Sequence, residues 1–144
     1  MLYSQKITLF NFIDSSQQYH SEVLNNVEYQ QSYANERAPG FDESIDHLIV
    51  LIKFKVVNDM KQTLDGKNFY LPNEFASLSD KTNAFTFQTQ RDFVALGDFS
   101  NYAFTDLETF KNAFPNNIFI INLWREYLSV LPHWEITSLR HMGR

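Results

Sequence analysis

Two copies of the pattern His-x-Glu are the first candidates for chemistry in this sequence. One is His20-Ser21-Glu22 and the other is His133-Trp134-Glu135. Residues two apart in an extended strand project from the same face, so each pair would present an imidazole beside a carboxylate. If the two strands were neighbours, the four side chains would suit zinc or iron. Any polar strand face also produces this pattern, and solvent-exposed side chains are the interpretation we favour.

The other histidines and aspartates favour structural roles. His47 directly precedes an apolar run, which is typical of a hydrogen-bonded residue at the start of a strand. Asp92 and Asp98 flank the segment FVALG, but glycoside hydrolysis needs two carboxylates at a fixed separation in a cleft, and a sequence does not show that. Asp98 follows Gly97, as in a turn. The sequence has no nucleophile elbow, P-loop or Gly-rich dinucleotide turn. We therefore expect no catalytic residue, no metal, no cofactor and no enzymatic activity.

The composition is typical of one folded domain with a substantial core. The 144 residues are 44% hydrophobic and 16% aromatic. The absence of cysteine excludes disulfides and thiolate ligands and fits a reducing compartment. The net charge of −5 argues against nonspecific binding to duplex DNA. We predict a single β-rich domain over residues 1–140 and a disordered tail over 141–144, with no signal peptide and no membrane span.

Alternation of polar and apolar residues with a period of two predicts strands along most of the chain. Strands are expected at 6–13, 19–24, 27–33 and 45–57, with Asn25-Asn26 as a turn or bulge.

The strand at 45–57 has the most regular pattern. One side is predicted to be apolar along its whole length, and it consists of Leu48, Val50, Ile52, Phe54 and Val56. Because Ile49 and Leu51 occupy the opposite side, we expect this strand to begin buried on both faces.

Two segments are expected to be helical. Pro72 would open a short helix at 72–78. The second helix is expected at 105–114, where Thr105 and Glu108 match a capping box and Asp106 would lie in the first turn. Parallel βαβ units would need more helices than these. The predicted fold is therefore mainly β, an antiparallel barrel or sandwich of about eight short strands with one or two short helices.

The last strand and one long loop carry the remaining predictions. Trp134 and Ile136 alternate with polar residues and are expected to close the core. The loop ANERAPGFDES, residues 34–44, is longer than an ordinary hairpin connection. Arg37, Phe41 and Asp42 in this loop are candidate contacts for a partner protein, since arginine and aromatic residues contribute most at interfaces. A surface loop with an incidental phenylalanine is the alternative.

Several segments, in their order along the chain, resemble a family of phage proteins. They are ITLFNF, VLNNVEY, FYLPNEFASL, DFVALGDF, TDLETFKNAFPNNIFII and LPHWEIT. The most specific are the Tyr70-Leu71-Pro72 step, the Gly97-Asp98 turn and the terminal His133-Trp134-Glu135 strand. The family comprises small structural proteins encoded in the head-morphogenesis clusters of tailed phages and prophages of Gram-positive bacteria. Where it carries a short polar step before its last strand, this chain has NLWREYLSV.

The resemblance implies a virion protein of the head–tail connection, a minor head, head-completion or neck component assembled in the host bacterial cytoplasm. Such proteins are small β-barrels with long loops that assemble as rings. The implied partners are sister subunits and other head, portal-adaptor or tail proteins, with no membrane. A net charge of −5 would also suit a ring through which viral DNA passes without binding. The alternative is a metal- or small-ligand-binding β-barrel, catalytic or not, that uses the His-x-Glu pairs.

Overall fold

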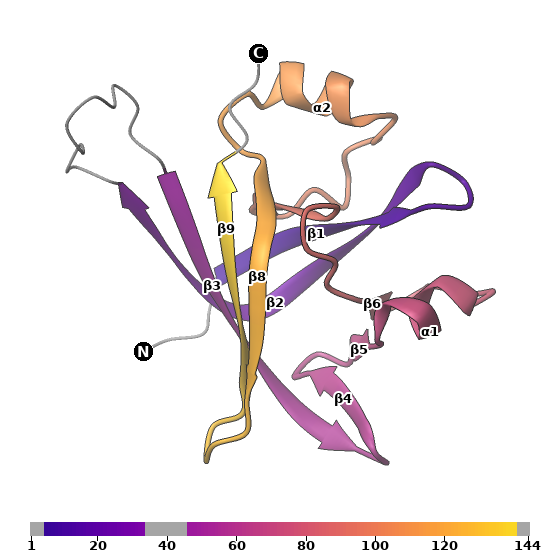
Figure 1. The fold of residues 1–144 in the computed structure, drawn as a ribbon, viewed down its shortest axis with the longest axis vertical. Coiled ribbons are helices and arrows are strands. Elements are labelled where there is room, and N and C mark those ends of the chain that lie inside the picture. The colour runs from indigo at the N-terminus through magenta and orange to yellow at the C-terminus, as the bar shows by residue number, and fades with distance from the viewer. Residues whose placement is uncertain (1–4, 34–45, 141–144) are drawn as a thin grey trace.

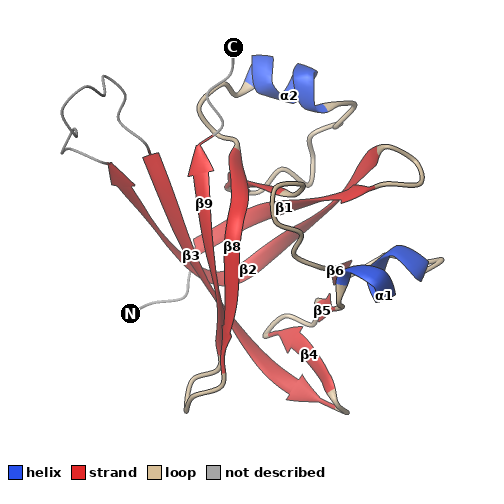
Figure 2. Ribbon diagram, in the orientation of Figure 1, coloured by secondary structure: helices blue, strands red, loops and turns tan. Residues whose placement is uncertain are grey.

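The computed structural model describes residues 5–33 and 46–140, which form a mainly β structure (Figures 1 and 2). The predicted fold class is confirmed, with 52% strand and 11% helix. The elements in the described ranges are β1 (Gln5–Ile13), β2 (Gln18–Tyr33), β3 (Asp46–Val57), β4 (Met60–Thr63), β5 (Asn68–Phe69), α1 (Pro72–Ser77), β6 (Ala84–Phe85), β7 (Phe93–Leu96), α2 (Leu107–Ala113), β8 (Phe119–Tyr127) and β9 (His133–Arg140). Arg37, Phe41, Asp42 and the predicted tail at 141–144 lie outside the described residues.

Six strands close into an antiparallel barrel. Around the barrel, β1 pairs with β2, β2 with β3, β3 with β9, β9 with β8, β8 with β7, and β7 with β1. The strands β4, β5 and β6 extend the sheet from the far end of β3, and β5 and β6 pair in parallel. Closure pairs each of the six barrel strands on both sides, which protects their backbone edges from nonspecific pairing.

The barrel interior is packed with aliphatic and aromatic side chains. Trp134 and Ile136 have no exposed surface, and the ring of Trp134 stacks on that of Phe54 with 4.3 Å between centroids. Phe69 and Phe85, from the excursion between β4 and β7, also contact Trp134. The last strand and this excursion therefore share one core.

The prediction for the faces of β3 is partly wrong. Leu48, Val50, Ile52 and Phe54 are buried as expected, but Val56 is 57% exposed. From Phe54 onward β3 pairs with β4 and continues past the barrel. The barrel interior therefore no longer covers this side of the strand at Val56. On the opposite side Ile49 and Leu51 are only half-buried.

Two neighbouring strands, β1 and β7, are buried on both faces. Ile7 and Leu9 point into the barrel, whereas Phe10 on the other face packs under α2 through Phe110, with 5.3 Å between the rings. The N-cap of α2 is Asp106, whose carboxylate accepts a hydrogen bond of 2.7 Å from the Thr109 N–H. The helix therefore begins one residue later than the capping box predicted.

Asparagine residues take positions that glycine often fills. Asn26 has φ 59° at a bulge, so the segments predicted as two strands, 19–24 and 27–33, form the single strand β2. Asn58 and Asp59 have φ of 52° and 65°, and they join Val57 to Met60 as a two-residue turn. Two successive positive φ angles are the signature of the turn that best matches strand twist. This hairpin adds β4, which the alternation pattern did not predict.

Candidate functional site

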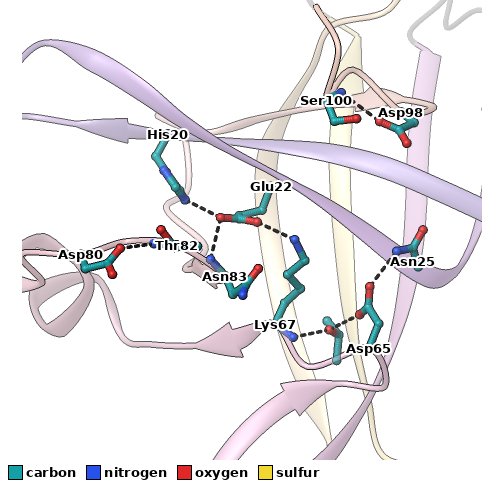
Figure 3. Close-up of polar contacts among 11 residues, drawn as sticks. His20, Glu22, Asn25, Asp65, Lys67, Asp80, Thr82, Asn83, Asp98 and Ser100 are labelled. Atoms are coloured by element: carbon teal, nitrogen blue, oxygen red, sulfur yellow. Dashed lines mark hydrogen bonds and ion pairs between the residues drawn. The ribbon is translucent and has the colours of Figure 1, made fainter.

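The first His-x-Glu pair forms the centre of a polar cluster (Figure 3). Glu22 is only 9% exposed, and each of its carboxylate oxygens has a partner. One oxygen lies 2.8 Å from His20 Nε2 and accepts the Asn83 N–H at 3.0 Å. The other lies 2.7 Å from Lys67 Nζ. The cluster therefore joins β2 to two segments of the excursion between β4 and β7.

The environment of Glu22 keeps it ionised. Burial raises the pKa of this carboxyl, but hydrogen bonds and charges from His20 and Lys67 outweigh burial and hold the pKa below its ordinary value. The ring of His20 also packs beside the buried Phe75 of α1, with 5.9 Å between centroids. The expectation of a solvent-exposed pair is thus wrong for His20 and Glu22, because the excursion covers their face of β2.

A second polar contact lies beside this cluster (Figure 3). Asn25 of β2 donates to the Asp65 carboxylate at 2.6 Å, and Asp65 also accepts from the Thr63 hydroxyl. Burial raises the pKa of Asp65, but these hydrogen bonds and the charge of Lys67 bring it below its ordinary value. Gly66, with φ 92°, completes the turn that follows Asp65. The hairpin between β4 and β5 is therefore anchored on the bulged part of β2.

A pocket of about 310 Å³ opens next to these two contacts. Its lining residues are Lys6, Ser21, Glu22, Val23, Asn25, Lys67, Asp98 and Ser100. The side-chain oxygen of Asn25 is buried and has no hydrogen-bond partner among the described residues. However, the most buried charge of this lining, Glu22, already has partners on both oxygens. A ligand would have to displace one of them to reach the carboxylate.

The second His-x-Glu pair lies on a different surface. His133 and Glu135 project from the outer face of β9, and β3 separates β9 from β2. His133 Nδ1 donates to the Leu131 carbonyl at 3.0 Å, and its ring stacks on Tyr127. Within residues 5–33 and 46–140, no three His, Cys, Asp or Glu side chains come together in a group suited to a metal ion. The two pairs do not converge.

Asp92 is a buried carboxylate that anchors the barrel wall. It has no exposed surface and accepts hydrogen bonds from Asn11 Nδ2 at 2.7 Å, Phe12 N at 2.8 Å, and Gln88 N and Nε2 at 2.8 and 3.0 Å. Burial raises its pKa to about 7, although these neutral donors oppose the rise. Asp98 is exposed and accepts from Ser100 N at 2.8 Å, which is the predicted turn role.

The loop between β8 and β9, residues 128–132, is an exposed apolar tip. Leu128, Val130 and Leu131 are 71%, 95% and 56% exposed. A hydrogen bond of 3.1 Å from Phe54 N to the Pro132 carbonyl fixes the base of this hairpin tip against β3. This loop was not predicted from the sequence as a candidate site. Its signal is the segment LSVLP, in which three of the five residues are aliphatic, although polar residues are usual in a connection.

A protein-family model covers residues 2–138, a span that includes the barrel, the Glu22 cluster and the hairpin tip. The chain belongs to DUF6751, a family of unknown function. No curated protein and no solved structure matches this DUF6751 chain. Neither of the helices in its described part has the length and apolar character needed to cross a membrane.

Proposed function

We propose that this DUF6751 protein is a structural component of the head–tail connection of a tailed phage, in a head-completion or neck position. It would act through protein–protein assembly and not through catalysis. The observation that carries the proposal is the hairpin tip, where Leu128, Val130 and Leu131 remain in water. Clustered apolar side chains at the surface of a small domain are typical of interaction sites.

The rest of the barrel is suited to present this tip to a partner. The hairpin extends from a closed six-stranded barrel. Lys61 of β4 contacts Glu126 of β8 at 2.6 and 2.7 Å, which fixes the hairpin at its β8 side. A hairpin held in this way enters a contact with little loss of backbone freedom. The phage context comes from the sequence resemblance, to which the β-barrel fold conforms.

In the described part of the chain, the buried carboxylates Glu22 and Asp92 are occupied in structural contacts, which also favours assembly over catalysis. Glu22 is held by His20 and Lys67, and Asp92 by four neutral donors. A general base must be free to reach a substrate proton.

The proposal is tested on particles and on the purified protein together. Virions purified from a host that carries the gene should contain the chain, and native mass measurement should detect complexes with head or tail proteins encoded beside it. Val130→Asp should remove these complexes, whereas Val56→Asp, the same change at another exposed valine, should keep them. Particles that lack the chain, together with the absence of any complex, would contradict the proposal.

Binding of a small polar ligand in the pocket beside Glu22 is a second candidate. The buried and unpartnered oxygen of Asn25 favours it, but the saturated Glu22 carboxylate weighs against it. Elemental analysis of the purified protein tests the metal-binding form. Stoichiometric metal that is lost in His20→Ala and kept in His133→Ala would support this second candidate against the first.

A further inference from the structure

We propose that copies of this chain associate head to tail, with the hairpin tip of one copy in a pocket between the β1–β2 turn and the start of α2 of the next copy. The inference rests on the proposed assembly function and specifies the contact between sister subunits. Three features carry it: the shape of the tip, the chemistry of the pocket, and their positions in the molecule.

The hairpin tip is a narrow apolar projection beside basic residues. Its most prominent side chain, Val130, is 95% exposed, and the five tip residues carry no charge. The backbone of β3 runs beside the base of the hairpin, where Lys53 is in register with His133, and the exposed Lys55 follows two residues later. A partner surface for this tip should therefore combine an apolar hollow with an acidic rim.

The pocket at the start of α2 has both properties. Its volume is about 370 Å³, and its lining residues are Gln17, Gln18, Tyr19, Phe104, Thr105, Asp106, Leu107 and Glu108. The half-buried Tyr19, Phe104 and Leu107 belong to the aromatic cluster under α2 and supply an apolar wall. Asp106 and Glu108 are exposed at the pocket, and the hydrogen bond from Thr109 holds the pKa of Asp106 below its ordinary value. Glu108 also contacts Lys111 Nζ at 3.5 Å, so the negative charge that the pocket offers to Lys55 of the next copy comes mainly from Asp106.

Tip and pocket lie toward opposite ends of the long axis. In Figure 1 the β8–β9 turn is at the lower end, whereas α2 and the β1–β2 turn lie in the upper half. A contact between two different surfaces of identical chains is heterologous, and it produces a ring when the rotation between neighbours closes. Another pocket, lined by Met60, Phe69 and Leu71 among others, also has acidic residues, but its lining includes Lys61, so its rim is of mixed charge.

The predicted contact is small, so its strength in an assembly would come from closure. A few aliphatic side chains in one pocket give weak pairwise binding, and closing a ring makes the last contact intramolecular. We therefore expect association that grows with protein concentration and weakens with salt, because Asp106 and Lys55 are exposed.

The test uses two variants with matched controls, measured by native mass spectrometry and light scattering. Val130→Asp changes the tip, and Val56→Asp is its control at another exposed valine. Gln18→Trp fills the pocket from an exposed position of β2, and Gln30→Trp is the control on the same strand. The wild type and both controls should form oligomers, and Val130→Asp and Gln18→Trp should be monomers with unchanged melting temperatures.

Mixing the two assembly-deficient variants separates a head-to-tail contact from any symmetric one. The Val130→Asp chain keeps an open pocket and the Gln18→Trp chain keeps an intact tip. A dimer of the two has a single contact and no ring closure, so an equimolar mixture at about 1 mM should form a dimer with one chain of each. A mixture that stays monomeric, or either variant assembling like the wild type, would overturn the proposal. So would a wild-type chain that remains monomeric at about 1 mM, the weak end of specific association.

These outcomes are distinct from those that test the proposed function. A mixed dimer formed by a chain that is absent from virions and forms no complex with head or tail proteins would keep the contact and exclude the phage role. A chain present in virions whose Val130→Asp variant still assembles would keep the role and exclude the contact.

Discussion

The two His-x-Glu pairs have the same spacing and opposite orientations in the barrel. In the first pair, His20 and Glu22 point toward the excursion between β4 and β7, and the intervening Ser21 is exposed. In the second pair, Trp134 points into the core, and His133 and Glu135 lie on the outer face. The alternation is the same in both strands, so the pattern of a strand alone does not decide which of its faces is buried.

The difference arises from what packs against each strand. The inner face of β9 meets Phe54 and Phe69, so an indole is the favourable residue there. The corresponding face of β2 meets Lys67 and the backbone of Asn83, which are donors that stabilise a buried carboxylate. A buried charge remains ionised only with such partners, and each can be removed experimentally.

The largest expected difference in stability is between the residues that lie in the middle of the two pairs, Trp134 and Ser21. We expect Trp134→Ala to lower the free energy of unfolding by about 3–5 kcal/mol, because it removes the largest fully buried side chain. Ser21→Ala, the equivalent position of the first pair, should change it by less than about 0.5 kcal/mol. Urea unfolding of both variants gives the two values, and equal losses would contradict the assignment of the faces.

The next effect concerns Asp92, a buried carboxylate whose donors are neutral. Its pKa of about 7 lies above the ordinary value of 3.8, so the folded state takes up a proton between these values. The contribution of Asp92 to stability is therefore present below about pH 4 and lost as the pH rises to 7. The difference between 3.8 and about 7 corresponds to roughly 4 kcal/mol at 1.36 kcal/mol per pKa unit.

Urea unfolding at a series of pH values checks this contribution. Asp92→Asn should remove the fall in the free energy of unfolding between pH 4 and 7. A loss of stability that is the same at every pH, caused by the amide, would not affect this test. Asp14→Asn, at an exposed carboxylate, is the matched control and should leave the profile unchanged. A wild-type profile that matches that of Asp92→Asn would show that the carboxyl is already ionised at pH 4.

Glu22 should behave in the opposite sense, because its partners are charged. Its pKa lies below the ordinary value of 4.5, so its contribution is present above that pH and lost as the pH falls through the lower value. Glu22→Gln should lower the free energy of unfolding at pH 7 by about 2 kcal/mol, since it leaves buried donors without a charged acceptor. Glu135→Gln is the control and should cost less than about 0.5 kcal/mol. Comparable losses in the two variants, measured by urea unfolding, would contradict the different burial of the pairs.

Much of the fold follows from local signals in the chain. The alternation around Trp134 and Ile136 predicts the buried face of β9. The tolerance of asparagine for positive φ predicts a turn or bulge at Asn26, which lies at a bulge. These features depend on residues within one strand or turn. The buried state of Glu22 depends on Lys67 and Asn83, which are 45 and 61 residues away in the sequence. The alternation of polar and apolar residues within β2 carries no information about those partners.

The same limit explains the error on β3 and the burial of both faces of β1, which was not predicted. Both faces of β1 are buried because α2, about a hundred residues later, covers Phe10, while Val56 is exposed because β3 continues beyond the barrel. The hairpin tip was not predicted as a candidate site, for a different reason. The segment LSVLP looks like core by composition, and only its place at the end of a hairpin shows that Val130 is in water.

The smallest effects compare the two histidines. His133→Ala should cost well under 1 kcal/mol, because its ring contacts Tyr127 and a carbonyl at the surface. His20→Ala should cost about 1 kcal/mol, because it removes a hydrogen bond to the buried Glu22. The sharper readout is the double-mutant cycle, in which His20→Ala should lose most of its effect in the Glu22→Gln background. His133→Ala combined with Glu135→Gln should be additive, since no contact joins the two side chains. Coupling in the second pair would mean that its histidine and glutamate interact on the outer face of β9.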